Sequence, residues 1–107
     1  MWEENLNRYD AIVAHCTRFD RKGKTMPHTS ANGHMFSLLN KEGVLGIRFA
    51  KEKQQRYMEA FTTSYFKSYG AAMNGYIQIP DALWLDTELL IRLLNESYDY
   101  VMSLPKK

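Results

Sequence analysis

The sequence predicts an α+β domain in which helices pack on one face of an antiparallel sheet of about four strands. Two observations lead to this prediction. Apolar residues recur at helical spacing in segments near the start and the end of the chain, and good helix formers fill a third segment in the middle. Between the first and the middle segment, Asn32-Gly33 and Asn40–Gly43 separate short apolar stretches, which is typical of β-hairpins. The predicted order is α-β-β-β-α-β-α.

The three helices are predicted from apolar residues that recur at helical spacing and from the amino-acid composition of each segment. The first runs from about Glu4 to Phe19, and its apolar stripe consists of Leu6, Tyr9, Ile12, Val13 and Cys16. The second spans Lys51–Phe61, which lacks glycine and proline. The last follows a helical turn at Asp81–Leu85 and is capped by Asp86 or Thr87. Its inner stripe consists of Leu90, Leu93, Leu94, Ser97 and Val101.

Three strands, at residues 24–31, 34–39 and 44–49, form a meander whose loop lengths predict its register. The first hairpin pairs Ala31 with His34 and Thr29 with Phe36. The second pairs Leu39 with Val44 and Phe36 with Ile47. A fourth short strand is predicted at residues 76–79, and the irregular aromatic segment 62–75, which includes Tyr69, is predicted as a long loop.

Side chains alternate between the two faces of a strand, so this register divides the residues into two sets. The core face is predicted to carry Phe36, Leu38, Leu45, Ile47, Phe49, Ile77 and Ile79. The second face is predicted to carry Met26, His28, Ser30, Met35, Ser37, Gly46, Arg48, Tyr76 and Gln78. Because the large apolar residues of both hairpins fall on one side, the register agrees with the hydrophobic pattern.

Composition narrows the classes of protein that the chain can represent. Its 107 residues, 45% hydrophobic and 24% charged, predict one globular domain over 1–107 with no separate C-terminal domain. One cysteine cannot form an internal disulfide, which indicates a reducing, cytoplasmic setting. An acidic start and no apolar run of membrane length argue against a secretory signal and a membrane span.

The chemistry-bearing residues form no recognisable catalytic arrangement. Phosphate-binding glycine loops and paired cysteines are missing from the sequence. His28 and His34 are predicted on opposite sheet faces and so cannot share a metal ion, while Cys16 lies on the apolar stripe and is predicted as an inert buried thiol. We therefore predict no catalytic residue, no metal and no cofactor, and the chain leans toward a non-enzymatic role.

Charge is concentrated in the middle of the chain. Residues 21–56 hold eight basic and two acidic residues, a net +6, whereas the two flanking segments are each −2. Such a segment is a candidate footprint for nucleic acid or another anion, with Lys24, Arg48, Lys51 and Lys53 as the contacts. Tyr65, Phe66, Lys67 and Tyr69 could add base stacking, and the alternatives are solvated turns and aromatic residues buried under a loop.

The second sheet face is the best candidate binding site in the sequence. It combines His28, Ser30, Met35, Arg48, Tyr76 and Gln78. Methionine and tyrosine adapt well to partners, and arginine binds anions, so this face could hold a protein partner, a second copy of the chain, or a small molecule or anion placed between His28 and Arg48. The alternative is that the first helix, the long loop or a second subunit covers the face.

Four stretches of the chain resemble the N-terminal domain of TfoX/Sxy proteins, whose fold is related to the MmcQ/YjbR group. They are Asn32-Gly33-His34-Met35-Phe36-Ser37-Leu38, Gly43-Val44-Leu45-Gly46-Ile47-Arg48, Met73 with Tyr76-Ile77-Gln78-Ile79-Pro80, and Ser97-Tyr98-Asp99-Tyr100-Val101 with Ser103-Leu104-Pro105-Lys106. The resemblance covers nearly the whole chain. It departs from the family at Met26-Pro27-His28-Thr29, where members often have Met-Phe-Gly-Gly.

The resemblance implies the fold and a bacterial, cytoplasmic origin, and it supplies no catalytic residues. Longer family members regulate DNA uptake and competence genes and carry a separate C-terminal domain. The expected function is thus a non-enzymatic interaction or regulatory module that acts through protein contacts. A nucleic-acid-associated protein and an anion-binding domain are the two alternatives.

Overall fold

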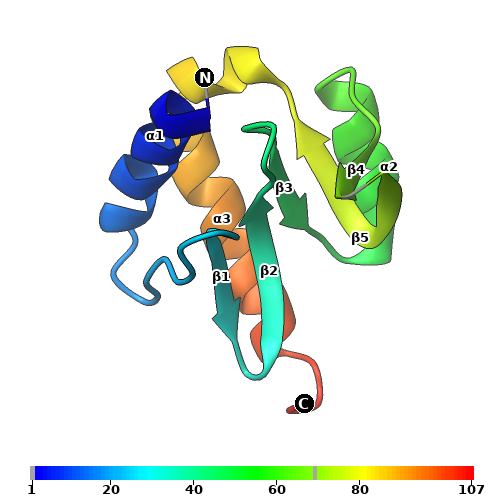
Figure 1. Ribbon diagram of the computed structural model, residues 1–107. Helices are drawn as coiled ribbons and strands as arrows, with labels where there is room; N and C mark the ends of the chain where they lie inside the picture. Colours follow the sequence, from blue (N-terminus) through cyan, green and yellow to red (C-terminus); the bar gives the residue numbers. More distant parts are fainter. Residues whose placement is uncertain (1, 69) are drawn as a thin grey trace.

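The computed structural model describes residues 2–68 and 70–107, and within them it shows an α+β fold (Figure 1). The elements are α1 (Trp2–Ala14), β1 (His28–Ala31), β2 (His34–Leu39), β3 (Leu45–Arg48), α2 (Lys51–Ala60), β4 (Tyr65–Ser68), β5 (Ala71–Ile79), a 3-10 helix η1 (Asp81–Leu85) and α3 (Thr87–Met102). All neighbouring strands are antiparallel, in the order β1-β2-β3-β5-β4.

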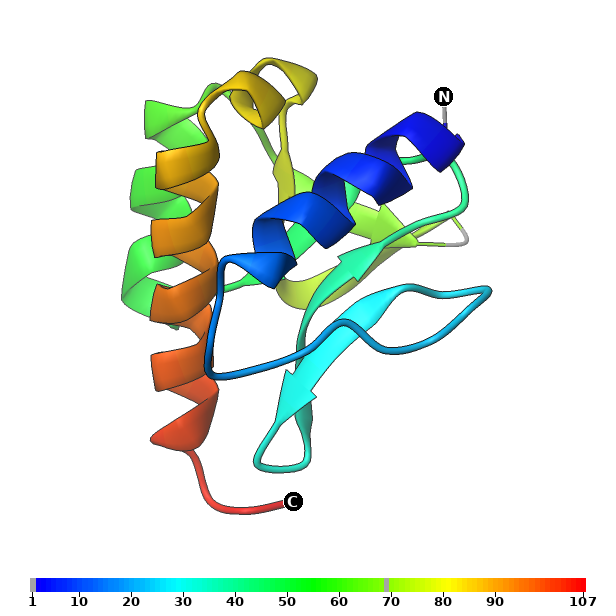
Figure 2. The same ribbon diagram turned by 90° about the vertical axis from the view of Figure 1, so that its left-hand side faces the viewer.

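The three helices contribute to one core against one face of the sheet, as predicted, but α1 ends at Ala14, five residues before the predicted end at Phe19. β1 likewise begins at His28, four residues after the predicted start of the first strand. Figure 2 shows α3 running along this side with α2 behind it. The core joins apolar residues of α1 and α3 to Leu45, Ile47, Ile77 and Ile79 of the sheet, and these four strand residues are at most 1% exposed. Asp86 caps α3 by accepting a hydrogen bond from the Leu89 amide, so the predicted cap is confirmed. None of the described helices is long and apolar enough to cross a bilayer.

A β-bulge in β2 corrects the predicted register of the first hairpin. Ala31 pairs with His34 as predicted, but Thr29 pairs with Ser37 instead of Phe36. Phe36 is thus an extra residue, and a bulge lets two successive side chains turn to the same face. Phe36 packs edge-on against Phe19, and the carbonyl of Phe36 accepts a hydrogen bond from Ser97 on α3.

The bulge also moves Ser37 and Leu38 to the faces opposite to those predicted. Ser37 is fully buried under α1, where its hydroxyl bonds to the hydroxyls of Tyr9 and Thr29. Burial raises the pKa of the Tyr9 phenol, so the hydroxyl stays protonated in this small polar cluster. Leu38 instead contributes to a second apolar cluster on the other face.

The second hairpin has a five-residue loop, one residue longer than predicted. Leu39 pairs with Leu45 and Ser37 with Ile47, so the predicted pairs Leu39–Val44 and Phe36–Ile47 are wrong. The Asn40 side chain explains the extra length, because its oxygen accepts hydrogen bonds from the backbone amides of Glu42 and Val44. The two added residues, one in the bulge and one in the loop, restore the predicted faces of Leu45, Ile47 and Arg48.

Residues 62–75 contain strands where a long loop is predicted. Tyr65–Ser68 forms β4, and β5 begins at Ala71, five residues before the predicted start of the last strand. The sequence hides this hairpin because Ala71, Ala72 and Asn74 are all exposed and show no alternation of apolar and polar residues. Tyr69 lies outside the described residues.

β4 covers the middle of the second sheet face. Phe66 is fully buried and lies directly over Gly46 of β3, while the Asn40 amide donates to the Lys67 carbonyl. Phe66, Leu38 and Tyr76 form a second cluster, and Met26, Met35, Val44 and Met73 pack around it. The aromatic segment therefore does cover this face, in the form of a strand.

The C-terminal segment binds to the turn of the first hairpin, and Figure 1 shows the C-terminus beside it. The Asn32 amide donates to the carbonyls of Val101 and Leu104 at 3.0 and 2.8 Å. Asn32 also has a φ of 56°, in the left-handed region that the tight turn requires. This residue thus serves two purposes, backbone geometry and side-chain hydrogen bonding.

Asn32→Ala is expected to lower the free energy of unfolding by about 2–3 kcal/mol, because it removes both hydrogen bonds and places alanine in the left-handed region. Asn32→Gly removes the same hydrogen bonds but tolerates the backbone angle, so we expect a loss about 1 kcal/mol smaller. Urea denaturation of the two variants and the parent chain measures both values. Equal losses would show that the backbone angle has no energetic weight.

Candidate functional site

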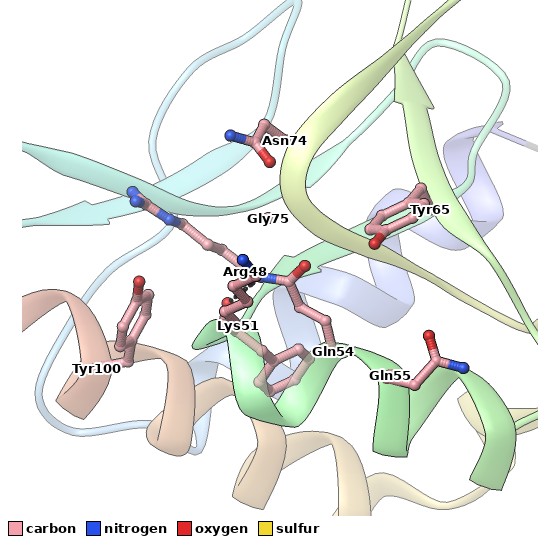
Figure 3. A pocket seen from close by; sticks show the side chains of 9 residues that line it. Arg48, Lys51, Gln54, Gln55, Tyr65, Asn74, Gly75 and Tyr100 are labelled. Atoms are coloured by element: carbon pink, nitrogen blue, oxygen red, sulfur yellow. Dashed lines mark hydrogen bonds between the residues drawn. The ribbon is translucent and has the colours of Figure 1, made fainter.

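A cationic cleft of about 500 Å³ lies where β3, α2, β5 and α3 meet (Figure 3). It is lined by Arg48, Phe49, Lys51, Gln54, Gln55, Tyr65, Asn74, Gly75 and Tyr100. Arg48 and Tyr100 lie at one end of the view, and Tyr65 lies at the other with its hydroxyl directed into the cleft.

Local structure fixes the position of each charged group. Arg48 is the last residue of β3, and the chain turns after it so that Lys51 becomes the first residue of α2. The Arg48 guanidinium carbon lies 5.6 Å from the centre of the Tyr100 ring, a cation–π arrangement. The Gln54 amide donates to the Phe49 carbonyl at 2.9 Å, which ties α2 to the end of β3.

The cleft has a one-sided charge. Both of its charged lining residues, Arg48 and Lys51, are cationic, and its other polar side chains are amides and phenols. Neither cation forms an ion pair with another described residue. The charge of Arg48 also acts on the neighbouring Tyr76, whose pKa burial raises to about 12 against the opposing effect of this guanidinium. Such a cleft is chemically suited to an anion.

The structure does not bring together in one pocket the six residues that the sequence groups as a second-face site, although three of them are in contact. Arg48 and Tyr76 are paired across β3 and β5, and the Tyr76 hydroxyl donates to the Met35 carbonyl at 2.6 Å. Gln78 is paired with Gly46 near the covering strand β4. Of the six residues His28, Ser30, Met35, Arg48, Tyr76 and Gln78, only Arg48 lines the cationic cleft.

His28 and Arg48 do not line a common cavity. His28 is on β1, paired with Leu38 two strands away from Arg48, and its Nδ1 atom lies 2.8 Å from the Met26 carbonyl oxygen. The intervening face is occupied by Leu38 and the packed ring of Phe66. An anion held jointly by His28 and Arg48 therefore has no site in the described part of the chain.

The basic segment is dispersed in space. Lys51 lines the cleft beside Arg48, whereas Lys53 on α2 is half-buried and does not line it. Lys24 is exposed on the connection between α1 and β1. Arg21 is paired with Asp10 through two hydrogen bonds of 2.7 and 3.1 Å, which neutralises one of the eight positive charges. The local pair Arg48–Lys51 is the part of the +6 segment that the fold brings together at the cleft.

Apart from Tyr65, the cleft residues other than Arg48 and Lys51 are not predicted as binding residues from the sequence. Gln54, Gln55, Asn74 and Gly75 carry no sequence signal of their own, and Tyr100 lies 52 positions after Arg48. Tyr65 is predicted as a base-stacking residue in a loop, and the structure places it on β4 at the edge of the cleft. A positive φ of 89° at Gly75 bends β5 and brings its backbone alongside Arg48.

Histidine, cysteine and carboxylate side chains do not line the cleft. Within residues 2–68 and 70–107, no cluster of three histidine, cysteine or carboxylate side chains could hold a metal ion. Cys16 is buried just after the end of α1, and its burial raises the pKa of the thiol, which disfavours the nucleophilic thiolate. These observations agree with the sequence-based assignment of Cys16 to the core.

Comparison with known proteins leaves the family open. The chain matches no protein-family model, and it matches no curated protein. The likeness to the TfoX/Sxy N-terminal domain remains a prediction from the sequence.

Proposed function

We propose that this chain is a non-enzymatic binding module that recognises an anionic group of its ligand or partner in the cationic cleft. One observation supports this most strongly: Arg48 and Lys51 both line a cleft of about 500 Å³ that has no acidic lining residue. A surface built only to keep a protein soluble mixes charges of both signs. An isolated pair of cations in a cleft instead favours the binding of a negative group.

Arg48 is the stronger of the two candidate ligands. Its guanidinium presents several N–H donors in one plane, which match the geometry of a carboxylate or a phosphate. The Tyr100 ring supports this plane and limits the rotamers of the side chain, so less conformational entropy is lost on binding. Lys51 adds a mobile positive charge to the same cleft.

The lining favours binding over catalysis. It contains arginine, lysine, amide, aromatic and glycine residues, without histidine, cysteine, aspartate or glutamate. These missing types are the ones that usually act as general bases and nucleophiles near neutral pH. The cleft can therefore orient an anion and neutralise its charge, which is what a recognition site requires.

The resemblance to the TfoX/Sxy N-terminal domain supports a regulatory role for this binding. We propose a bacterial, cytoplasmic setting, in which the cleft would couple an anionic ligand to contacts with a protein partner or with a second copy of the chain. The ligand would stabilise one conformation of the Arg48 side chain and one position of α2, because Arg48 and α2 both line the cleft.

Arg48→Gln is expected to weaken the binding of inorganic phosphate at least tenfold, because it removes a charge-assisted hydrogen-bond donor from the cleft. Lys51→Gln should weaken it less, since a lysine side chain is mobile and keeps its charge hydrated. Titration of the amide chemical shifts with phosphate in a low-salt, phosphate-free buffer measures the affinity. We expect the largest shifts around Arg48, Gln54 and Gly75.

Lys24→Gln is the matched control, because it removes the same charge from an exposed position on the connection before β1. The control should bind phosphate like the parent chain. Equal weakening by Lys24→Gln and Arg48→Gln would mean that phosphate responds only to net charge, and it would contradict the proposal. The absence of any phosphate-dependent shift in the cleft would contradict it as well.

A further inference from the structure

An apolar recess adjoins the cationic cleft. It measures about 260 Å³ and is lined by Tyr65, Ala72, Met73 and Asn74. Tyr65 and Asn74 line both the recess and the cleft, so the two spaces meet at these side chains. The combined site has a cationic end at Arg48 and an apolar, aromatic end at Tyr65.

Tyr65 is a platform for a flat ring. Its side chain is 46% exposed although it lies within a β-strand, and such an exposed aromatic residue offers a face for stacking. Asn74 also lines the recess, and its exposed amide carries both a donor and an acceptor. An apolar face bordered by an amide is suited to a heteroaromatic ring, which has a flat surface and polar edges.

The cationic end sets the chemistry of the other half of the ligand. Arg48 and Lys51 carry two positive charges, which a phosphate monoester can match with its two negative charges near neutral pH. The basic residues Lys24 and Lys53 do not line the cleft, so it does not continue through them as a track for a long phosphate backbone. The cleft and recess together are thus chemically suited to one phosphate and one flat ring.

From these features we infer that the ligand is a nucleoside monophosphate unit, either a free nucleotide or the phosphorylated end of an oligonucleotide. The phosphate lies against Arg48 and Lys51, and the base stacks on Tyr65 beside Asn74. This inference rests on the proposed function, because it names the ligand class of the same cleft. It adds the base-binding half, which the proposed function does not require.

The test compares adenosine monophosphate, inorganic phosphate and adenosine by isothermal titration at constant ionic strength. We expect the nucleotide to bind at least tenfold more tightly than either fragment, because it engages both ends of the site. Tyr65→Ala should weaken nucleotide binding roughly tenfold, the value of one stacked base, and should weaken phosphate binding much less, because Arg48 and Lys51 remain. Arg48→Gln should weaken the binding of both, and Lys24→Gln should affect neither.

Two oligonucleotides, with and without a 5′-phosphate, distinguish a free nucleotide from the end of an oligonucleotide as the natural ligand. A short oligoadenylate with a 5′-phosphate that binds more tightly than the nucleotide would identify a chain end as the ligand, and the reverse order would identify the free nucleotide; both results support the inference. If the oligonucleotide without a 5′-phosphate binds as well as the phosphorylated one, the inference is overturned.

The failures of the two proposals are distinguishable. A nucleotide that binds no more tightly than inorganic phosphate, with Tyr65→Ala without effect, would overturn the base-binding inference and leave anion recognition intact. If neither phosphate nor nucleotide binds the cleft, both proposals are wrong.

Discussion

Gly46→Ala is expected to lower the free energy of unfolding by about 3 kcal/mol, even though the change adds a single methyl group. A Cβ atom at this position would lie 2.3 Å from Cγ of Phe66, far inside van der Waals contact. Phe66 is fully buried, so its ring has no open space into which it can move. Relief requires a shift of β4 away from β3, which would open the second cluster.

A double-mutant cycle tests this explanation of the loss. Phe66→Ala alone should cost about 3–5 kcal/mol because it leaves a cavity in the second cluster. In the Phe66→Ala background the new methyl group at position 46 enters that cavity, so Gly46→Ala should then cost much less than it does in the parent chain. Thermal or urea denaturation of the four chains gives the coupling energy, and additive losses would rule out the proposed clash.

Stability is expected to fall steeply between about pH 10 and pH 12. Burial raises the pKa of Tyr76 to about 12, and burial together with the Glu96 carboxylate raises that of Tyr57 to about 12 as well. The pKa of Tyr9 is raised in the same direction. Unfolding returns each phenol to an ordinary pKa near 10.

The direction in which stability changes with pH follows from proton binding to the phenols. Below pH 10 these phenols are protonated in both states, and their contribution to stability is fully present. Between pH 10 and 12 the unfolded chain releases protons that the folded chain retains, so each phenol lowers the free energy of unfolding by up to about 1.4 kcal/mol per pH unit. Above the folded pKa that contribution is lost.

Urea denaturation at pH 8, 9, 10 and 11 measures this dependence. Tyr76→Phe should be less stable than the parent chain at pH 8, because it loses the hydrogen bond to the Met35 carbonyl. The difference between the two chains should shrink as the pH rises past 10, since the variant has one fewer phenol to ionise. A constant difference over the whole range would contradict the raised pKa of Tyr76.

The sequence predicts the helices and the core of this fold because both follow from local periodicity. The stripe of α3, the Asp86 cap and the Asn32-Gly33 turn each depend on residues within a few positions of one another. The bulge at Phe36 does not follow from nearby residues, because it depends on two distant partners. The Phe36 ring packs against Phe19, and the Phe36 carbonyl accepts a hydrogen bond from the Ser97 hydroxyl. One such irregularity exchanges the faces of Ser37 and Leu38.

The binding site is harder to predict than the fold. Arg48 and Lys51 could be named from the sequence, because charge and hairpin register place them near the end of a strand. Tyr65 could be added to them only as a stacking residue in a predicted loop, and nothing in the sequence groups Asn74 or Tyr100 with them. These three residues come from three further elements and meet only when β5 bends at Gly75. The segment that supplies Tyr65 lacks the alternating pattern by which a strand is usually predicted.

The bulge in β2 has a consequence for tracing the ancestry of this chain. A relative with a regular strand here would have one residue fewer between Met35 and Leu38, and its correct alignment would need a gap inside a strand. Gaps are usually placed in loops, where insertions are tolerated. An ungapped comparison would match core positions with surface positions on one side of Phe36, and it would underestimate the kinship of two chains with the same fold.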